Sequence, residues 1–182
     1  MYEFVLWQAR KAMDWDDTEG DLDFDIVYKD IGGNIGLQAS SSVYDGELVF
    51  DRTIPSLLNI DFVSNNSFYD SVAAFGDSVF LIFNTDEYTQ MPLVTIGEDT
   101  VLVNGNGLTW TAMKQLGEGD SEGFVPFKIT YKDFGGNIGI PTTIATDSAT
   151  VSFDRTAPEI MNLIMASDNS DSDSLAKVGN TV

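Results

Sequence analysis

Oxygen-bearing side chains are the groups in this sequence that could do chemistry. The 182 residues include 29 aspartates and glutamates but no histidine and no cysteine. Without those two residue types, Ser-His-Asp and Cys-His catalysis and zinc sites with histidine or cysteine ligands are excluded. The carboxylates suit two other kinds of chemistry. They could act in pairs as acid and base, or they could bind a hard cation such as Ca²⁺, which takes about six to eight oxygen ligands.

The overall charge limits the classes of partner. The formal net charge is −20 at pH 7, with only 9 lysines and arginines. Nucleic-acid binding needs basic residues that neutralise phosphates, so no nucleic-acid partner is expected. An acidic surface instead favours solubility, cation binding or a saline setting. No apolar run is long enough to span a bilayer, so no membrane insertion is expected within this segment.

A nine-residue phrase that occurs twice shows how the chain is organised. Residues 28–36 read YKDIGGNIG, and residues 131–139 read YKDFGGNIG. Paired glycines beside aspartate and asparagine are typical of a tight polar turn. The copies begin at Tyr28 and Tyr131 and are therefore 103 residues apart. That period is too long for a solenoid repeat and matches a whole small domain, so the sequence predicts an array of modules.

The same offset holds well beyond the phrase and requires no insertion. It joins Trp7 to Trp110, Asp17 to Asp120, Glu19 to Glu122, residues 50–53 to 153–156, and Pro55 to Pro158. Proline cannot donate to a strand ladder and suits a linker, so we place the module boundary at residues 53–55. We therefore predict the C-terminal part of a first module in residues 1–53, a complete module in residues 54–156, and the N-terminal part of a third module in residues 157–182.

The complete module has the pattern of an antiparallel β-sandwich. Leu108, Trp110 and Ala112 alternate with threonines, which is the period of a half-buried strand. The sequence NGNG at residues 104–107 predicts a hairpin turn. Short strands, turn signals between them and the lack of helical periodicity predict an all-β fold of tandem sandwich modules. The predicted strands lie near residues 57–63, 79–83, 93–96, 100–103, 108–113, 125–131 and 149–153.

The strand predicted at residues 79–83 departs from simple alternation. All five residues are apolar, so Phe80 and Ile82 would point away from the core. Either this strand is central in its sheet or covered by a loop, or its outer face is a lateral contact surface between neighbouring chains.

Several short motifs, in their order and spacing, carry a resemblance to a known family. They are Gly76-Asp77-Ser78-Val79, Asp86-Glu87, Trp110-Thr111-Ala112, the turn from Asp133 to Asn137, and the ending from Phe153 to Pro158. Together they resemble bacterial Ig-like tandem repeats, which build large cell-surface and secreted proteins, many of them adhesins. The resemblance implies Ig-like sandwiches of about seven strands, an extracellular location, and a stalk or spacer role, often with calcium at module junctions.

The resemblance also implies where acidic loops meet. In an Ig-like module some loops lie at the end where the chain enters and others at the end where it leaves, so side chains from both neighbours converge at a junction. Clustered carboxylates and an amide could supply the oxygens of a Ca²⁺ site that locks the relative tilt of the modules. The candidate ligands are Asp17, Glu19, Asp51, Asp86, Glu87, Asp133 and Asn137.

Other interpretations of these acids stay open. Asp30 and Asp133 could simply cap their turns while the remaining acids are solvated surface, or another cation could bind. Residues 168–173 are a weaker candidate site, because acidic Ser-rich loops are often disordered.

Three function classes fit the sequence to different degrees. The leading hypothesis is a structural, extracellular tandem-repeat protein without enzymatic activity, forming a stalk, spacer or fibre. Its expected partners are neighbouring modules of the same protein, with self-association into a fibre as a variant. The alternative is a carbohydrate- or ligand-binding adhesive module, which needs an exposed aromatic platform or a pocket. A glycosidase would use two acids, but the acids here recur at repeated positions, whereas an active site more often occurs once per chain.

Overall fold

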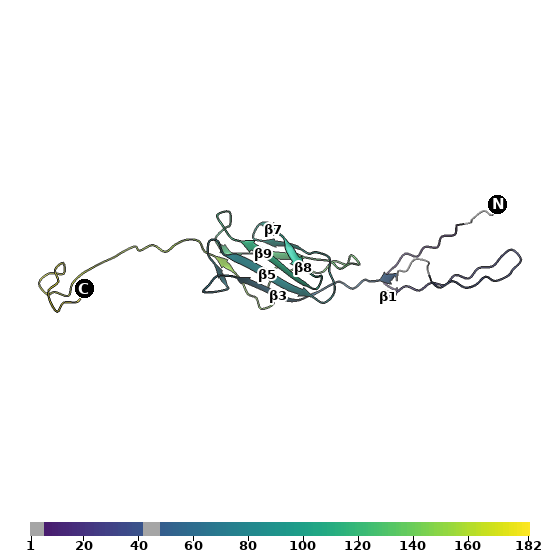
Figure 1. Ribbon diagram of the computed structural model, residues 1–182, viewed down its shortest axis with the longest axis horizontal. Coiled ribbons are helices and arrows are strands. Elements are labelled where there is room, and N and C mark those ends of the chain that lie inside the picture. The colour runs from purple at the N-terminus through teal and green to yellow at the C-terminus, as the bar shows by residue number, and fades with distance from the viewer. Residues whose placement is uncertain (1–5, 42–47) are drawn as a thin grey trace.

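The computed structural model of the protein describes residues 6–41 and 48–182. These residues form strands, turns and loops, and they contain no helix that could cross a membrane. Figure 1 shows a compact β-structured body in the middle of the chain, with more extended segments running to both termini. The described residues therefore have an all-β fold. Residues 1–5 and 42–47 of the predicted first module lie outside the described part.

The strands fall into two groups along the chain. Strands β1 and β2 belong to the N-terminal segment, and β3 to β12 all lie within residues 54–156. Within that range seven strands have three or more residues, and three strands have two. The bounds are β1 Gly20–Asp21, β2 Val49–Phe50, β3 Leu57–Ser64, β4 Val72–Ala73, β5 Ser78–Thr85, β6 Leu93–Ile96, β7 Asp99–Val101, β8 Val103–Gly105, β9 Thr109–Gln115, β10 Gly123–Phe124, β11 Phe127–Thr130 and β12 Ser152–Phe153.

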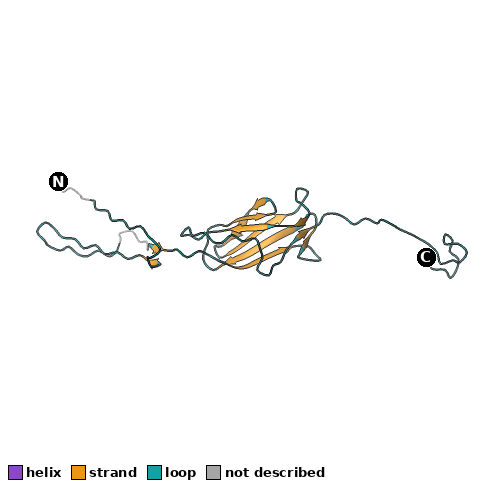
Figure 2. Ribbon diagram, turned by 180° about the vertical axis from the view of Figure 1, so that it is seen from behind, coloured by secondary structure: helices purple, strands orange, loops and turns teal. Residues whose placement is uncertain are grey.

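Two larger sheets and one small sheet make up the body (Figure 2). The four-stranded sheet has the order β3-β5-β9-β8 and the three-stranded sheet the order β11-β6-β7, and both are antiparallel. The small sheet has the order β10-β12-β4, in which β12 and β4 run parallel. All three sheets contribute to one core, where the rings of Phe62 and Phe127 are 4.9 Å apart. This packing is β-sandwich-like.

Strand β5 shows why residues 79–83 are apolar on both faces. Val79, Leu81 and Phe83 are fully buried in the core, while Phe80 and Ile82 are half-buried on the other face. Strand β5 pairs with β3 on one side and with β9 on the other, so it is a central strand. Neighbouring strands flank a central strand closely, which explains why its outward side chains are shielded in part.

The sequence pattern did not predict that residues 100–103 belong to two strands, and it did not predict the short strands β4 and β10. The strand predicted at residues 100–103 is divided at the exposed Leu102. Strand β7 before it pairs with β6, and β8 after it pairs with β9, so the chain passes from one sheet to the other. Strands β4 and β10 have two residues each, too few to show a periodicity.

The sequence repeat is also a structural repeat. The same backbone pairings occur in residues 20–50 and, 103 positions later, in residues 123–153. They are Gly20 with Phe50 and Gly123 with Phe153, Ile26 with Ala39 and Ile129 with Thr142, and Lys29 with Ile35 and Lys132 with Ile138. The local structure of this part of the module is therefore encoded by its own residues.

Burial differs sharply between the two copies. Trp110 is 5% exposed, but its counterpart Trp7 is 88% exposed. Tyr131 is 6% exposed, whereas Tyr28 is 54% exposed. Among the described residues before the linker, β1 and β2 are the strands present, and they leave Trp7 and Tyr28 in solvent.

The C-terminal segment repeats a loop of the complete module. The Ser167 amide donates to the Asp173 carbonyl over 2.7 Å, as Ser64 does to Asp70 over 2.7 Å. The Asp168 amide donates to the Thr181 carbonyl over 3.1 Å, matching the pairing of residues 65 and 78. This loop therefore forms its turns without a surrounding sandwich.

Candidate metal centre

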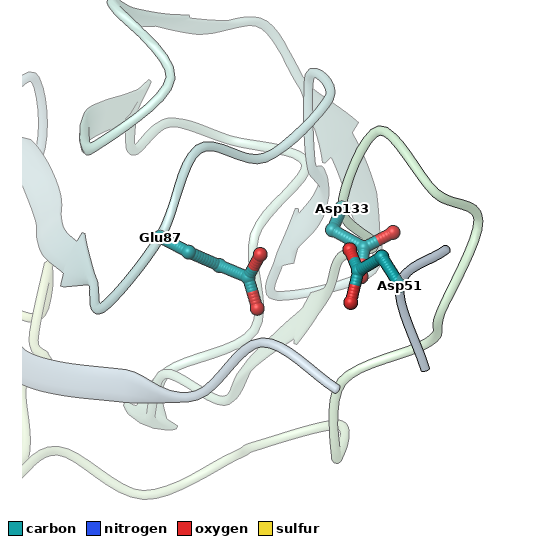
Figure 3. A group of neighbouring side chains, drawn as sticks. All are labelled: Asp51, Glu87 and Asp133. Atoms are coloured by element: carbon teal, nitrogen blue, oxygen red, sulfur yellow. The ribbon is translucent and has the colours of Figure 1, made fainter. Parts of the chain in front are cut away.

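Three carboxylates converge where the linker meets the complete module. Asp51 directly follows β2, Glu87 follows β5, and Asp133 opens the glycine turn after β11. One carboxylate oxygen of each lies within 4.8 Å of the other two (Figure 3). Oxygens on opposite sides of a Ca²⁺ ion, each about 2.3–2.6 Å from it, would be about 5 Å apart. The spacing therefore fits oxygen ligands around one calcium ion.

The glycine turn holds Asp133 rigidly. This side chain is 1% exposed, and its Oδ1 accepts hydrogen bonds from the amides of Gly136, at 2.6 Å, and Asn137, at 2.8 Å. Its Oδ2 accepts from Nδ2 of Asn137 at 2.8 Å. Gly136 has a φ of +97°, a left-handed conformation that favours glycine. The turn therefore presents an immobilised carboxylate to the cluster.

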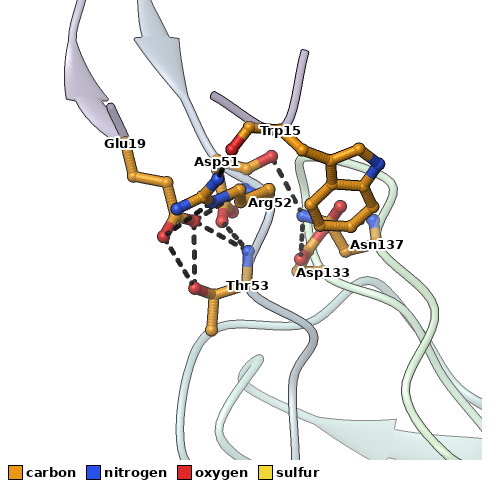
Figure 4. Close-up of polar contacts among 7 residues, drawn as sticks. All are labelled: Trp15, Glu19, Asp51, Arg52, Thr53, Asp133 and Asn137. Carbon is orange, nitrogen blue, oxygen red and sulfur yellow. Dashed lines mark hydrogen bonds and ion pairs between the residues drawn. The ribbon is translucent and has the colours of Figure 1, made fainter. Parts of the chain in front are cut away.

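A second glycine gives the linker room to approach that turn. A Cβ atom at Gly135 would lie 3.1 Å from Oδ2 of Asp51 and 3.2 Å from Oδ1 of Asp133. The absence of a side chain thus lets two carboxylates sit against one backbone position. Nδ2 of Asn137 also donates to the backbone carbonyl of Asp51 over 3.2 Å, and this joins the linker to the turn (Figure 4).

The charges of the cluster are not balanced by protein cations. Among the residues that the structure describes, no lysine or arginine forms an ion pair with Asp51, Glu87 or Asp133. Burial, together with the negative charges of Asp51 and Asp133, raises the pKa of the Glu87 carboxyl. Carboxylates that repel one another in this way gain from a bound cation.

The other predicted ligands are engaged elsewhere. Asp17 pairs with Lys11, and that hydrogen bond lowers the pKa of Asp17. The backbone amide of Arg52 donates to Glu19 and lowers the pKa of that carboxyl. Burial of Asp86 acts to raise its pKa, but hydrogen bonds from Ser56 bring the pKa below its usual value.

The remaining candidates also have defined positions. Asn137 uses its amide nitrogen to bind Asp133 and the carbonyl of Asp51. In the loop of residues 168–173, Oδ2 of Asp171 lies 3.6 Å from Nζ of Lys177, and the described residues of this loop form no three-carboxylate group. The structure thus brings together three of the seven predicted ligands, while Asn137 supports them.

A charged cluster near the other end of the module contains a lysine that pairs with its carboxylates. Lys114 is buried and contacts the carboxylates of Asp99, at 2.8 Å, and Asp120. Burial of Lys114 acts to lower its pKa, but the hydrogen bonds that it donates to the two aspartates raise the pKa above its usual value. The Lys11–Asp17 pair repeats this contact 103 positions earlier. The recurrence marks it as part of the module framework, and the sequence offset could have revealed it.

No protein-family model, curated protein or solved structure matches this chain. Its fold and site define an all-β, β-sandwich-like chain with a three-carboxylate group where a linker meets a module.

Replacing Glu87 tests whether the three carboxylates repel one another. Folding raises the pKa of Glu87, so the folded state holds the proton of this carboxyl more tightly than the unfolded state does. This stabilisation is fully present below about pH 4.5 and is lost as the pH rises through the folded-state pKa. In EDTA at pH 7, Glu87→Gln should therefore stabilise the module by roughly 0.2–1 kcal/mol. Urea unfolding at pH 7 and again below about pH 4.5 measures this gain in the free energy of unfolding, which should vanish at the lower pH. Glu159→Gln, at an exposed position outside the cluster, serves as control, and equal effects of both variants would contradict the repulsion.

Proposed function

We propose that this chain is a structural segment of an extracellular tandem-repeat protein, in which it serves as a stalk, spacer or fibre element. The observation that carries the proposal is the structural repeat: two copies of one unit, 103 residues apart, build the same backbone pairings and the same contacts to the linker that follows them. Modules of constant length joined by short proline-containing linkers suit a spacer. The resemblance to bacterial Ig-like repeats supports an Ig-like topology and a location at the cell surface.

Calcium at the linker is the second part of the proposal. Asp51, Glu87 and Asp133 would hold the ion, and Gly135 would leave room for two of these carboxylates. A bound Ca²⁺ supplies charge neutralisation and a link between loops, not catalysis. Because Asp51 belongs to the linker and the other two to the complete module, binding would restrict the angle between the module and the segment before it.

Self-association into a fibre extends the same proposal. Ile160, Leu163 and Ile164 of the C-terminal segment are strongly exposed. Extended apolar segments of this kind can add to the sheet of another chain. Neighbouring modules of the same protein are the partners that we propose for this segment.

A second candidate function has one observation in its favour. Four exposed aromatic residues lie on or beside the small sheet: Phe68, Tyr69 and Phe75 flank β4, and Phe124 belongs to β10. Their counterparts at the 103-residue offset are Asp171, Ser172, Val178 and Asp21, so the aromatic group is particular to the complete module. Aromatic faces of this kind would suit the stacking of a sugar ring in an adhesive module.

One measurement tests the calcium part of the proposal, and a second tests the adhesive alternative. Small-angle X-ray scattering of the 182-residue protein should give a narrower range of shapes in CaCl₂ than in EDTA, because the ion would restrict the junction. Superimposable curves in the two buffers would contradict the calcium part of the proposal. Binding to a glycan array that is lost in a Tyr69→Ala, Phe124→Ala double variant would favour the adhesive module instead.

A further inference from the structure

The linker between the first segment and the complete module is held from its N-terminal side by Glu19. Oε1 of Glu19 accepts hydrogen bonds from the backbone amides of Arg52, at 2.7 Å, and Thr53, at 2.8 Å. It also accepts from the Thr53 hydroxyl at 2.9 Å (Figure 4). Nη1 of Arg52 in turn donates to the carbonyl of Trp15. Glu19 therefore attaches the linker to the segment that precedes it.

A second carboxylate holds the linker from its C-terminal side. Asp86, which follows β5, accepts hydrogen bonds from the amide of Ser56, at 2.8 Å, and from the Ser56 hydroxyl. The amide of Asp86 donates back to the carbonyl of Ser56 over 3.1 Å. Ser56 is thus attached to the complete module through its amide, its hydroxyl and its carbonyl.

Only two residues lie between these attachments. Thr53 is bound by Glu19 and Ser56 by Asp86, which leaves Ile54 and Pro55. Pro55 is buried, and its ring restricts φ to about −65°. The residue before a proline is confined to extended conformations, so Ile54 has little freedom as well.

The N-terminal attachment recurs at the next linker. Glu122 accepts from the Arg155 amide at 2.8 Å and from the Thr156 hydroxyl at 2.8 Å. Nη1 of Arg155 donates to the carbonyl of Glu118 over 2.9 Å, as Arg52 does to Trp15. The attachment belongs to the repeat unit and is not a peculiarity of one junction.

From these contacts we infer that the junction is stiff without any metal, because Glu19 and Asp86 clamp the linker on both sides and confine bending to Ile54 and Pro55. The inference deepens the proposed spacer role and draws its biological meaning from that role. It does not depend on calcium, since neither clamping carboxylate is in the three-carboxylate group. Calcium would add a second restraint between Asp51 and the complete module.

Spin-label distances across the junction test the clamp in the full 182-residue protein, which has no native cysteine to interfere. Labels at Thr18→Cys and Lys128→Cys, both exposed positions, report the angle between the first segment and the module. In EDTA the unsubstituted junction should give a narrow distance distribution. Glu19→Ala should widen it about twofold, because the freed linker amides would bond to water instead. Asp86→Asn should widen it less, because the amide oxygen can still accept.

The chain offers a matched control. Glu122→Ala removes the same contacts at the next linker and should leave the measured distribution unchanged. A second label pair at Thr18→Cys and Gln38→Cys reports the shape of the first segment itself, and it should stay equally narrow in Glu19→Ala. Widening of this second pair would overturn the inference, because Glu19 would then hold the segment together rather than the linker. So would an equally narrow cross-junction distribution in Glu19→Ala.

The same labels separate this inference from the proposed function. If Glu19→Ala widens the distribution in EDTA and calcium changes nothing, the clamp stands and the calcium part of the proposed function fails. If calcium narrows the distribution but Glu19→Ala has no effect, the clamp fails and the calcium proposal stands.

Discussion

Saturating calcium is expected to raise the unfolding temperature of the complete module by about 10–20 °C relative to EDTA. An ion that binds only the folded state adds about 2.7 kcal/mol when its free concentration is about a hundredfold above the dissociation constant. In a module of ~100 residues, each kcal/mol moves the unfolding temperature by about 4–8 °C. The physical reason is the uncompensated repulsion among Asp51, Glu87 and Asp133. Circular dichroism during heating measures the shift.

The repeat supplies a matched pair of variants for this experiment. Asp51→Asn keeps an oxygen that can accept the amide hydrogen bond of Thr53 but removes one charge from the cluster. It should abolish most of the calcium-dependent shift. Asp154 occupies the same place in the next linker and accepts the same bond from Thr156, but it is not part of the three-carboxylate group. Asp154→Asn should therefore leave the calcium shift intact, and an equal loss in both variants would contradict the assigned site.

Replacement of Gly139 by alanine is expected to destabilise the module by about 1–3 kcal/mol. A Cβ atom there would lie less than 3.0 Å from ring atoms of Tyr131, a contact too close to persist. Tyr131 is buried in the core and cannot move aside without disturbing its neighbours. Overpacking of this kind forces strained side-chain or backbone shifts. The midpoint of urea unfolding, followed by the fluorescence of Trp110, measures the loss.

Two other glycines serve as comparisons for Gly139. Gly119→Ala adds a methyl group where no atom lies within 4 Å, and it should change stability little. Gly36 faces the ring of Tyr28 in the same way, but Tyr28 is largely exposed and free to turn away. Gly36→Ala should therefore leave the stability of the complete module unchanged. A Gly139→Ala variant as stable as Gly119→Ala would show that Tyr131 adjusts without cost.

Much of the fold could be predicted because its signals are local. Alternation of side chains located most longer strands within a few residues. The offset between Tyr28 and Tyr131 predicted the spacing at which backbone pairings recur. The division of β7 from β8 could not be predicted, because it depends on which sheet each half joins. The same limit applies to β4 and β10, which exist only through their pairing with β12.

The site was partly accessible from the sequence for a similar reason. Residue type and the resemblance predicted seven ligands near a junction, and three of them, Asp51, Glu87 and Asp133, lie close together in the structure. The pattern could not show that Glu19 is already bound to linker amides 33 and 34 positions away. Nor could it show that Asp86 is bound to Ser56, 30 positions earlier. These long-range contacts place Glu19 and Asp86 outside the three-carboxylate group.

The parallel pairing of β12 with β4 has a mechanical consequence. Strand β12 is the last strand before the second linker. Two hydrogen bonds join it to β4: the Ser152 amide donates to the Ser71 carbonyl at 3.0 Å, and the amide of Asp154, which directly follows β12, donates to the Ala73 carbonyl at 2.9 Å. A pulling force on the two linkers would act along β12 and therefore across these bonds. They would then bear tension together in shear instead of opening one after another like a zipper. The β10-β12-β4 sheet, the smallest of the module, would thus be the first to bear the pulling force.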